Sequence, residues 1–579
     1  MKYAAKKLSA LIITLFMVSV LAFLAFQIIP GDPTTKMLGT EATPEAVREL
    51  RAQLGLDRPV FLRYGSWLAG FLSGDMGTSY SYQMPVADMI GQKLPVTALL
   101  TALSFVFTVL LSIPLGVLAG SVRNRFLDRA IAVLDQLFMS IPPFFLGILM
   151  CYVFGILFRL FVPGDFVALE ADPWGCIRYL VFPALAIAIP RAAMTVKMLR
   201  SSVAKELRQA IITKLNSAHS KSAILLTNQS GCAPQRPHSR HYVSGCLHGG
   251  NSHRQHHHRA GVYHPRHWAA APGQHFQPGF PRGTGGGGHF GRLDRGRELF
   301  GRLVESVGKE ASMKKRNFFF CLGGFLSAAM SLLILIGLVW TPYGTTQMDA
   351  SAKTQPPSWH HLMGTDNFGR DIFSRVLGGA GTSFLVALAV VAIGCVFGLL
   401  IGGLCGYYGG VADAILTRLC DTLTAFPSVL LALVILSLTK GGTYNIILVL
   451  GILFIPSFAR VVRAEFARCK EQNYVKSARL MGASDLRIMA LHILPNIMQV
   501  LLPSITIGFN NAILSEASMS FLGLGVQPPE ASLGSLLSDS QTYLLSAPWY
   551  ALCTGGTMVL LILGFSMLGE GISQSDRRK

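Results

Sequence analysis

Long apolar runs set the strongest limit on what this chain can fold into. The first run follows three lysines and is too long for the core of a secretion signal, which takes about 7–15 residues. A helix of about 20 apolar residues crosses the roughly 30 Å of hydrocarbon in a bilayer. The sequence therefore predicts transmembrane helices at four places near the N-terminus: Leu11–Ile29, Val96–Ala119, Ala130–Phe161 and Tyr179–Met198.

A second group of apolar runs begins after a short basic cluster. Met313 is followed by Lys314, Lys315 and Arg316 and then by an apolar stretch, which looks like a second N-terminus. Five further runs lie near Ser383–Tyr407, Leu419–Leu438, Tyr444–Val462, Ile497–Leu522 and Trp549–Leu568. The chain is thus predicted to be an all-α polytopic membrane protein in three parts: about four helices in a truncated half at 1–205, an irregular segment at 206–312, and about six helices in a complete domain at 313–579.

Charge and composition agree with a membrane location and indicate an orientation. Only 14% of the residues are charged, whereas soluble domains have about 25%. The net charge of +20 comes from 50 Lys and Arg against 30 Asp and Glu, and such an excess marks cytoplasmic loops. The N-terminus, with Lys2, Lys6 and Lys7, is therefore predicted to be cytoplasmic. Nucleic-acid binding would need a basic face on a soluble fold, and the apolar runs leave little room for one.

A basic loop in the second half carries the pattern that is most informative about function. It reads EQNYVKSARLMGASDLRIMALHILPN, from Glu471 to Asn496. The residues before Gly482 favour a helix, and the glycine permits a tight turn. A second amphipathic stretch, Ser484–Leu494, is expected to end at Pro495, because proline cannot continue the backbone hydrogen bonding. Such a structure makes a short, rigid protrusion that suits docking into a cleft on a partner.

The same loop resembles the ATPase-coupling loop of ABC-importer permeases. The family pattern is E-A-A, three residues, glycine, and then I-x-L-P about nine residues later. Lys476, Ser477 and Ala478 fill the E-A-A positions here, so the acidic residue of the family is replaced by lysine. The resemblance implies a coupling loop whose candidate residues are Tyr474, Lys476, Ser477, Ala478, Gly482, Ala483, Leu494 and Pro495.

Other stretches resemble the dipeptide, oligopeptide and nickel branch of that family. HLMGTDNFGRDIFSR (361–375) and SEASMSFLGLGVQPPEASLGSLL (515–537) are similar to one permease subunit. The stretches IIPGDP (28–33), 54–80 and 94–120 are similar to the other permease subunit, with which the first one pairs in that family. The chain resembles both permeases joined end to end, and the resemblance implies type I (MetI-like) helical bundles. Glu516 lies at the end of an apolar run, where it could be functional or simply face water.

The resemblance implies a membrane component of an ATP-driven importer of di- or oligopeptides in the inner membrane of a bacterium. Its expected partners are ABC ATPase subunits, an extracytoplasmic substrate-binding protein, membrane lipid and an intact partner permease. No G-x-x-x-x-G-K-[ST] phosphate loop occurs in the chain, so ATP hydrolysis is expected on another subunit, and no catalytic residue, cofactor or metal is assigned. Nickel import by the same family is one alternative. A secondary transporter with a metal-binding linker is another.

The segment between the two halves is rich in histidine. Residues 211–300 hold 12 of the 15 histidines. Read one base later from Ser252, the codons permit V-T-G-S-I-I-I-E-Q-V-F-T-I-P-G-I-G-R-L-L, which resembles the family's stretch leading into its fifth-to-sixth helix region. We interpret the segment as an out-of-frame, disordered stretch whose frameshift begins between about Leu207 and Gly245 and fuses two genes. The alternatives are a His-rich linker or a metal sensor that binds nickel or zinc.

Overall fold

The computed structural model describes residues 43–229 and 318–576, except residues 54, 80, 81, 123 and 440, together with short pieces at 7–8, 11–13, 15–20, 23 and 34. Regular secondary structure in these residues is helical, with two isolated β-bridges. The chain divides into two compact units, one formed by Met1–Lys205 with Met313–Lys579 and the other by Glu206–Ser312. Most of the histidine-rich segment lies outside the described residues, and its interpretation stays a prediction.

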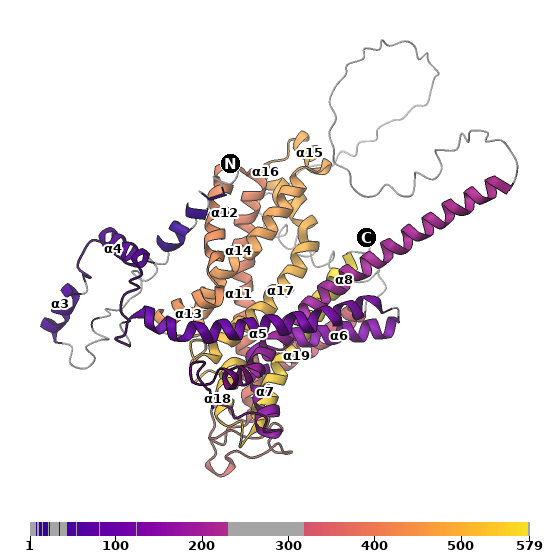
Figure 1. Cartoon of the computed structure of the whole chain (residues 1–579). Coiled ribbons are helices and arrows are strands. Elements are labelled where there is room, and N and C mark those ends of the chain that lie inside the picture. The colour runs from indigo at the N-terminus through magenta and orange to yellow at the C-terminus, as the bar shows by residue number, and fades with distance from the viewer. Residues whose placement is uncertain are drawn as a thin grey trace, which may run out of the picture. The chain divides into compact units, whose positions relative to one another are not determined.

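Within residues 43–205 of the first half, the short helices α3 and α4 come first, and the apolar helices α5 to α8 follow (Figure 1). α5 packs against α8 through glycines, since a Cβ atom at Gly116 would lie 2.7 Å from Leu199 and one at Gly120 would lie 2.7 Å from Val203. These close approaches bring two long helices together without bulky side chains between them. From residue 43 on, the described helices of this half are α3 Pro44–Gln53, α4 Val60–Ser73, α5 Val86–Ser121, α6 Arg125–Ser140, α7 Pro143–Met150, η2 Cys151–Leu157 and α8 Pro173–Gln229.

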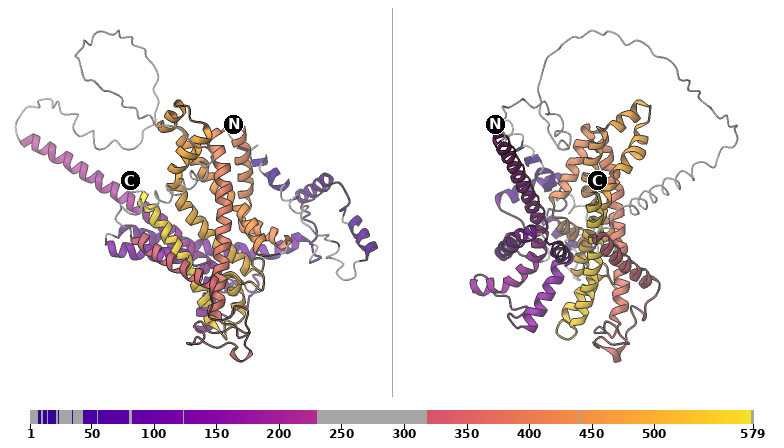
Figure 2. Two further views of the ribbon diagram at one scale, coloured as in Figure 1. Left: turned by 180° about the vertical axis from the view of Figure 1, so that it is seen from behind. Right: turned by 90° about the vertical axis from the view of Figure 1, so that its right-hand side faces the viewer.

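The second half is built around α11 and α14, which run side by side in both Figure 1 and Figure 2. Its buried core joins side chains from α10, α11, α14, α17 and α19. The elements are α10 Phe318–Val339, η3 Ala350–Ala352, α11 Ile372–Tyr408, α12 Gly410–Ala425, α13 Ser428–Thr439, α14 Thr443–Lys470, α15 Asn473–Leu480, α16 Asp485–Arg487, η4 Ile488–Ile493, α17 Leu494–Phe521, α18 Leu533–Thr542 and α19 Pro548–Asp576.

The predicted membrane spans can be compared with the helices one by one. Within the described residues, seven helices are long and apolar enough to cross a membrane, and two bent helix pairs raise the number to nine. Each of the nine overlaps a predicted span, which confirms the all-α membrane fold. The first predicted span, Leu11–Ile29, lies mostly outside the described residues, so the count of four plus six stays a prediction.

Two of the predicted spans are bent, and both bends lie at prolines. The run at Ala130–Phe161 bends by 93° between α6 and α7, and the run at Leu419–Leu438 bends by 80° between α12 and α13. Each break falls directly before or at a proline, Pro142–Pro143 in the first case and Pro427 in the second. A residue before proline is pushed out of the helical region into an extended conformation, so the helices end there.

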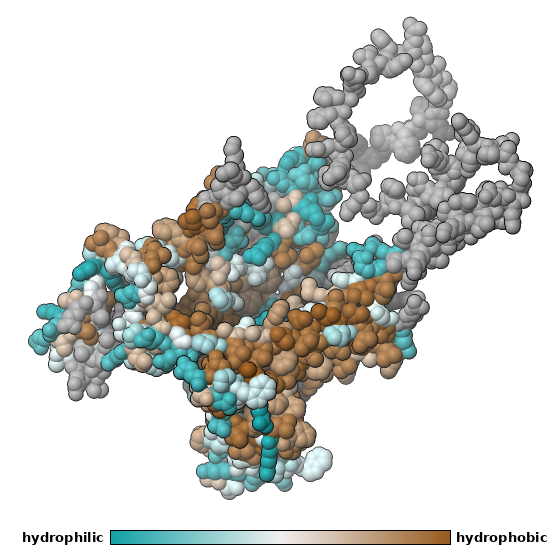
Figure 3. All heavy atoms as spheres, viewed as in Figure 1, coloured by the Kyte–Doolittle hydropathy of each residue, from teal (hydrophilic) through white to brown (hydrophobic). Residues whose placement is uncertain are grey.

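Apolar side chains also cover much of the outer surface. Phe105, Leu110 and Leu118 on α5 are 62–70% exposed, and Figure 3 shows an apolar band over α5 and α6. Hydrophilic residues gather instead over α15 and α16 (Figure 3). A soluble protein rarely exposes so large an apolar surface, whereas lipid tails cover such a surface without cost.

The two halves contact each other within the first compact unit. Phe145 of α7 packs directly on Gly555 of α19, since a Cβ atom at Gly555 would lie 2.0 Å from the nearest atom of the Phe145 ring. Lys197 of α8 forms an ion pair with Glu570 of α19 at 2.6 Å. Phe144 stacks on Phe521 with ring centroids 4.9 Å apart. An apolar seam with an ion pair beside it therefore joins the halves.

Candidate functional site

The basic loop between α14 and α17 forms a protrusion, which we name the docking loop (residues 471–495). α14 ends at Lys470, and α15 begins three residues later at Asn473. α16 and η4 then lead back into α17. Figure 1 shows α15 and α16 at one end of the α11–α14–α17 group. The helix–turn–helix that the sequence predicts before and after Gly482 is present.

Gly482 closes α15 with a backbone motif that depends on glycine. Its φ is +78°, in the left-handed region that L-residues rarely adopt. The Gly482 N–H donates to the Arg479 carbonyl at 3.0 Å, and the Ala483 N–H donates to the Ala478 carbonyl at 3.1 Å. These two bonds make up a Schellman motif, which satisfies helix-end carbonyls. A Cβ atom at Gly482 would meet nothing within 4 Å, so backbone conformation, and not space, selects glycine.

The candidate residues of α15 fall on two faces. Val475 and Ala478 are 1% and 2% exposed and pack into the core. Tyr474, Lys476 and Ser477 are exposed. Lys476, which stands in the acidic position of the pattern, lies 3.8 Å from Glu471, and both side chains are more than half exposed. An exposed pair of this kind contributes little to stability, so Lys476 is free to face a partner.

Three apolar side chains form the tip of the docking loop, and the sequence reasoning missed them. Leu480, Met481 and Leu486 are 89%, 81% and 75% exposed, on either side of Gly482. Apolar groups rimmed by polar residues mark contact surfaces for other proteins. The available signal was a Leu-Met pair directly before a turn glycine, a place where polar residues are usual.

Pro495 does not end the second stretch of the loop, which corrects the expectation from the sequence. The backbone stays helical from Asp485 to Phe521. Pro495 lies in the first turn of α17, directly after the π-helical turn Ile488–Ile493. Pro495 has no N–H group to donate within this continuous helix, and the wider π turn before it shifts the hydrogen-bond pattern so that the helix continues past the proline. Leu494 packs against the core and Pro495 is exposed.

The two ends of the docking loop meet at α15. Tyr474 lies beside Asn496 at the start of α17, so the structure brings it near Leu494 and Pro495. Partial burial, followed by the neighbouring Cys469 thiol, raises the pKa of Tyr474 to about 12. Its phenol is therefore neutral at ordinary pH and acts as a neutral polar group at the base of the loop.

Tyr407, near the end of α11, forms hydrogen bonds with two residues of the docking loop. Its hydroxyl donates to Asp485 Oδ1 at 2.6 Å and accepts from Arg479 Nη2 at 2.9 Å. The hydrogen bond with Tyr407 is also the main reason that the pKa of Arg479 is raised. No local pattern could have identified Tyr407, because it lies 72 residues from Arg479 and 78 from Asp485 in the chain.

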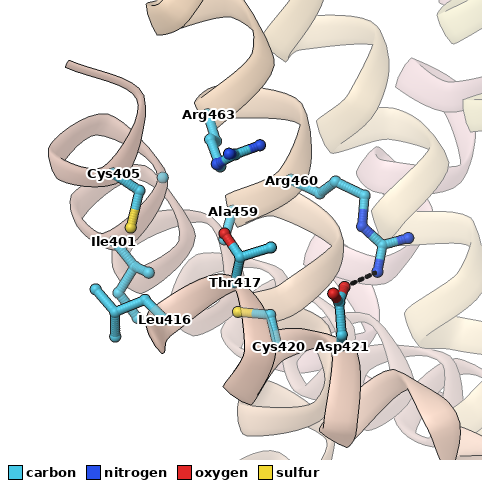
Figure 4. Close-up of a pocket in the computed structure, with 10 residues that line it drawn as sticks. Ile401, Cys405, Leu416, Thr417, Cys420, Asp421, Ala459, Arg460 and Arg463 are labelled. Atoms are coloured by element: carbon cyan, nitrogen blue, oxygen red, sulfur yellow. Dashed lines mark ion pairs between the residues drawn. The ribbon is translucent and has the colours of Figure 1, made fainter. Parts of the chain in front are cut away.

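A small pocket lies between α11, α12 and α14 (Figure 4). Its volume is about 40 Å³, which holds a few water molecules but is far below the roughly 300 Å³ of a small-molecule site. Arg460 forms an ion pair with Asp421 at 3.8 Å, and Arg463 donates to Asp413 at 2.7 Å. These two polar contacts join α12 to α14, and the pocket between them is too small for a peptide.

At the opposite end of α11, the loop at residues 340–371 is fixed by buried charges. Asp366 is 1% exposed and accepts from the backbone N–H groups of Phe368 and Arg370, both at 2.9 Å. Its other oxygen accepts from the guanidinium groups of Arg370 and Arg375 at 2.7 and 2.6 Å. Arg375 also donates to Tyr550 of α19 at 3.1 Å. This network ties the loop to two transmembrane helices.

Glu516 is also buried, which excludes the simple water-facing position. The residue is 0% exposed within α17. Ser520 donates to its Oε1 at 2.7 Å. The carboxyl group is therefore enclosed by protein near the end of α17 and is not part of the docking loop.

The fold and the loop together define a polytopic membrane protein in which the basic loop between α14 and α17 protrudes from the helices. Comparison with family models gives a match to "binding-protein-dependent transport system inner membrane component" at residues 112–213 and again at 394–575. The N-terminal model of the same transport systems matches residues 1–101. The same model thus matches on both sides of the histidine-rich segment, as a fusion of two permeases would give.

Curated relatives belong to the same kind of transport system, and this chain covers most of the length of each. A dipeptide transport system permease of Haemophilus influenzae is 34% identical over 264 residues, which are 45% of this chain and 90% of the relative. A putative peptide transport system permease of Brucella suis is 38% identical and covered over 87% of its length. A glutathione transport system permease of Pectobacterium atrosepticum is 36% identical and covered over 84%.

This chain belongs to the binding-protein-dependent transport system inner membrane components, the permeases of ABC importers. Less than half of it spans most of a complete relative, so it has the length of about two permeases. It is a multi-pass inner-membrane protein and the permease component of such a system, and the family is not itself catalytic. Membership sets aside the secondary transporter as the function of the chain.

Proposed function

We propose that this chain forms the translocation path of an ATP-driven peptide importer and that the docking loop receives the ATPase subunits. The observation that carries the proposal is the apolar tip of Leu480, Met481 and Leu486 on a turn fixed by Gly482. Apolar side chains on a turn whose backbone is already fixed lose less conformational entropy on binding than they would on a flexible loop. A second protein, outside the membrane, delivers the peptide.

Peptides are the proposed substrate class because the similar permeases are named for dipeptides, peptides and glutathione. The small pocket between α11, α12 and α14 does not contribute to the choice, since its volume is about 40 Å³. The proposed substrate-binding protein selects the peptide, and the permease passes it on. Uptake of radiolabelled dialanine by cells that carry the complete importer tests this part of the proposal.

The docking role is tested by two glycine variants with matched backbone geometry. Gly482 and Gly523 both have φ +78°, both are exposed, and a Cβ atom at either would meet nothing within 4 Å. Valine at either position introduces a left-handed backbone strain of about 1–2 kcal/mol. We expect Gly482→Val to abolish co-purification of the ATPase subunits and Gly523→Val to retain it. Equal retention by both variants would contradict the docking role.

We also propose that the first permease is interrupted by a frameshift. Its family match ends at residue 213, within the predicted window from about Leu207 to Gly245. The match in the second half is longer and continues to residue 575. Sequencing the gene across this window in independent isolates tests the proposal. The same uninterrupted frame in every isolate would count against a sequencing error or a recent mutation.

A further inference from the structure

The contacts of Tyr407 reach both sides of the turn in the docking loop. The residue is 2% exposed and ends α11 next to Tyr408. Arg479 and Asp485, its hydrogen-bond partners, each lie three residues from Gly482, one before the turn and one after it. The Arg479 guanidinium also lies 5.7 Å from the centre of the Tyr407 ring. One side chain therefore holds both arms of the turn.

A third contact connects Tyr407 to the start of the loop. The ammonium group of Lys470, the last residue of α14, lies 6.0 Å from the centre of the same ring. Cations at this distance from an aromatic face are attracted by its electron-rich surface. Tyr407 of α11 therefore contacts both the point where the docking loop leaves α14 and the two sides of its turn.

α11 in turn is fixed tightly to α14 over several turns. A Cβ atom at Gly402 would lie 2.4 Å from the Ala459 carbonyl oxygen, and one at Gly406 would lie 2.5 Å from the Arg463 carbonyl oxygen. At Gly398 it would lie 2.5 Å from the Phe458 side chain. The two backbones are therefore in direct contact, and packed interiors transmit displacement because they are hard to compress.

We propose that Tyr407 is a positioning residue of the docking loop, and this inference rests on the proposed docking function. Its hydroxyl fixes Arg479 and Asp485 at one place on the end of α11. A displacement that an ATPase imposes on the loop then moves α11 and α14 together. The ring supplies the cation contacts, and the hydroxyl supplies the fixed geometry of the turn.

The first test compares Tyr407→Phe with Tyr408→Phe in the full chain, reconstituted in lipid nanodiscs. Tyr408 is 57% exposed and adjoins Tyr407, with ring centroids 5.2 Å apart, so its variant is a matched control. Amide hydrogen exchange over residues 473–487 should rise about tenfold in Tyr407→Phe, because the loop opens locally without its anchor. Exchange over residues 383–400 of α11 should not change. Wild-type exchange in the loop of Tyr407→Phe would overturn the inference.

The second test breaks the same hydrogen bond from the other side. Arg479 is exposed, so Arg479→Gln should fold even if Tyr407→Phe does not. We expect each variant to weaken binding of the purified ATPase subunits about tenfold, the usual loss when a hydrogen bond to a charged group is removed. Tyr407→Phe also removes the bond to Asp485, but both variants remove the Tyr407–Arg479 bond, so the loss in the double variant should be clearly smaller than the sum of the two single losses. A simple sum of the two losses would show independent roles and overturn the inference.

These outcomes distinguish the anchor from the docking loop itself. If Gly482→Val retains the ATPase like the wild type, the docking function fails. If Gly482→Val loses the ATPase while Tyr407→Phe and Arg479→Gln keep wild-type affinity, only the role of Tyr407 fails. A purely structural role for Tyr407 would lower the melting temperature of the whole chain. A positioning role changes loop exchange and ATPase affinity while the melting temperature stays within about 2 °C.

Discussion

The two ends of α11 hold their loops in different ways. The loop at residues 340–371 is clamped by Asp366, whose carboxylate accepts four hydrogen bonds and is fully enclosed. On the side of α11, the docking loop is held by the hydroxyl of Tyr407, whose partners Arg479 and Asp485 are both exposed. A buried ionic network makes any opening costly, whereas hydrogen bonds to exposed partners are exchanged for bonds to water at a smaller cost. The two ends of α11 therefore hold their loops with different strengths.

The largest expected effect comes from breaking the clamp. Asp366→Ala leaves the Arg375 side chain, which is 9% exposed, without its buried counter-charge. We expect a loss of about 3–5 kcal/mol in the free energy of unfolding, measured as a lower melting temperature of the purified chain in detergent. Asp349→Ala, in the exposed part of the same loop, is the control and should melt within a few degrees of the wild type. Equal melting of the two variants would show that Asp366 is not a clamp.

A smaller effect is expected at the start of α11. Asp371 caps the helix by accepting from the Ser374 N–H at 2.8 Å, and it also contacts His361 at 3.0 Å. Removing an N-cap carboxylate costs about 1 kcal/mol, so Asp371→Ala should lower the melting temperature modestly. Asp371→Ser keeps a capping oxygen and should restore most of the loss in the same assay. A serine variant as unstable as the alanine variant would assign the effect to His361 instead.

At the tip of the docking loop, in contrast to Asp366 and Asp371, a substitution should change binding strongly and leave stability nearly unchanged. Leu480→Ser alters a side chain that is 89% exposed, so the free energy of unfolding should change by less than about 0.5 kcal/mol. Affinity for the ATPase subunits should fall about tenfold, as for an apolar anchor at an interface. Leu545→Ser, at an 81% exposed leucine between α18 and α19, should leave the affinity unchanged.

The smallest effect on stability is expected at Lys476. Its contact with Glu471 is 3.8 Å long and exposed on both sides, so Lys476→Ala should change the melting temperature by no more than the error of the scan. If Lys476→Glu, which supplies the acidic residue of the family pattern, strengthens ATPase binding, the lysine is a tolerated departure. If it weakens binding, the partner carries a complementary acidic surface.

Local sequence determined much of this protein. Apolar runs fix the helices because a chain in lipid must satisfy its own backbone hydrogen bonds, and Gly482 predicts the turn because only glycine adopts its φ of +78° without strain. Pro142 and Pro427 mark the two bends in the sequence, but a search for apolar runs alone treats each bent pair of helices as one continuous span. Pro495 shows the reverse case, since a local rule predicted a helix end that a π turn avoids.

Only the tertiary structure decided how the docking loop is held and which of its faces is offered. The exposure of Leu480 and the burial of Ala478, two residues apart on α15, follow from which side of the helix meets the core. The contacts of Tyr407 with Arg479 and Asp485 exist because α11 and α14 approach through glycines, far from the loop in sequence. Backbone preferences act between neighbours in the chain, whereas an anchor such as Tyr407 depends on the packing of helices that the local pattern does not encode.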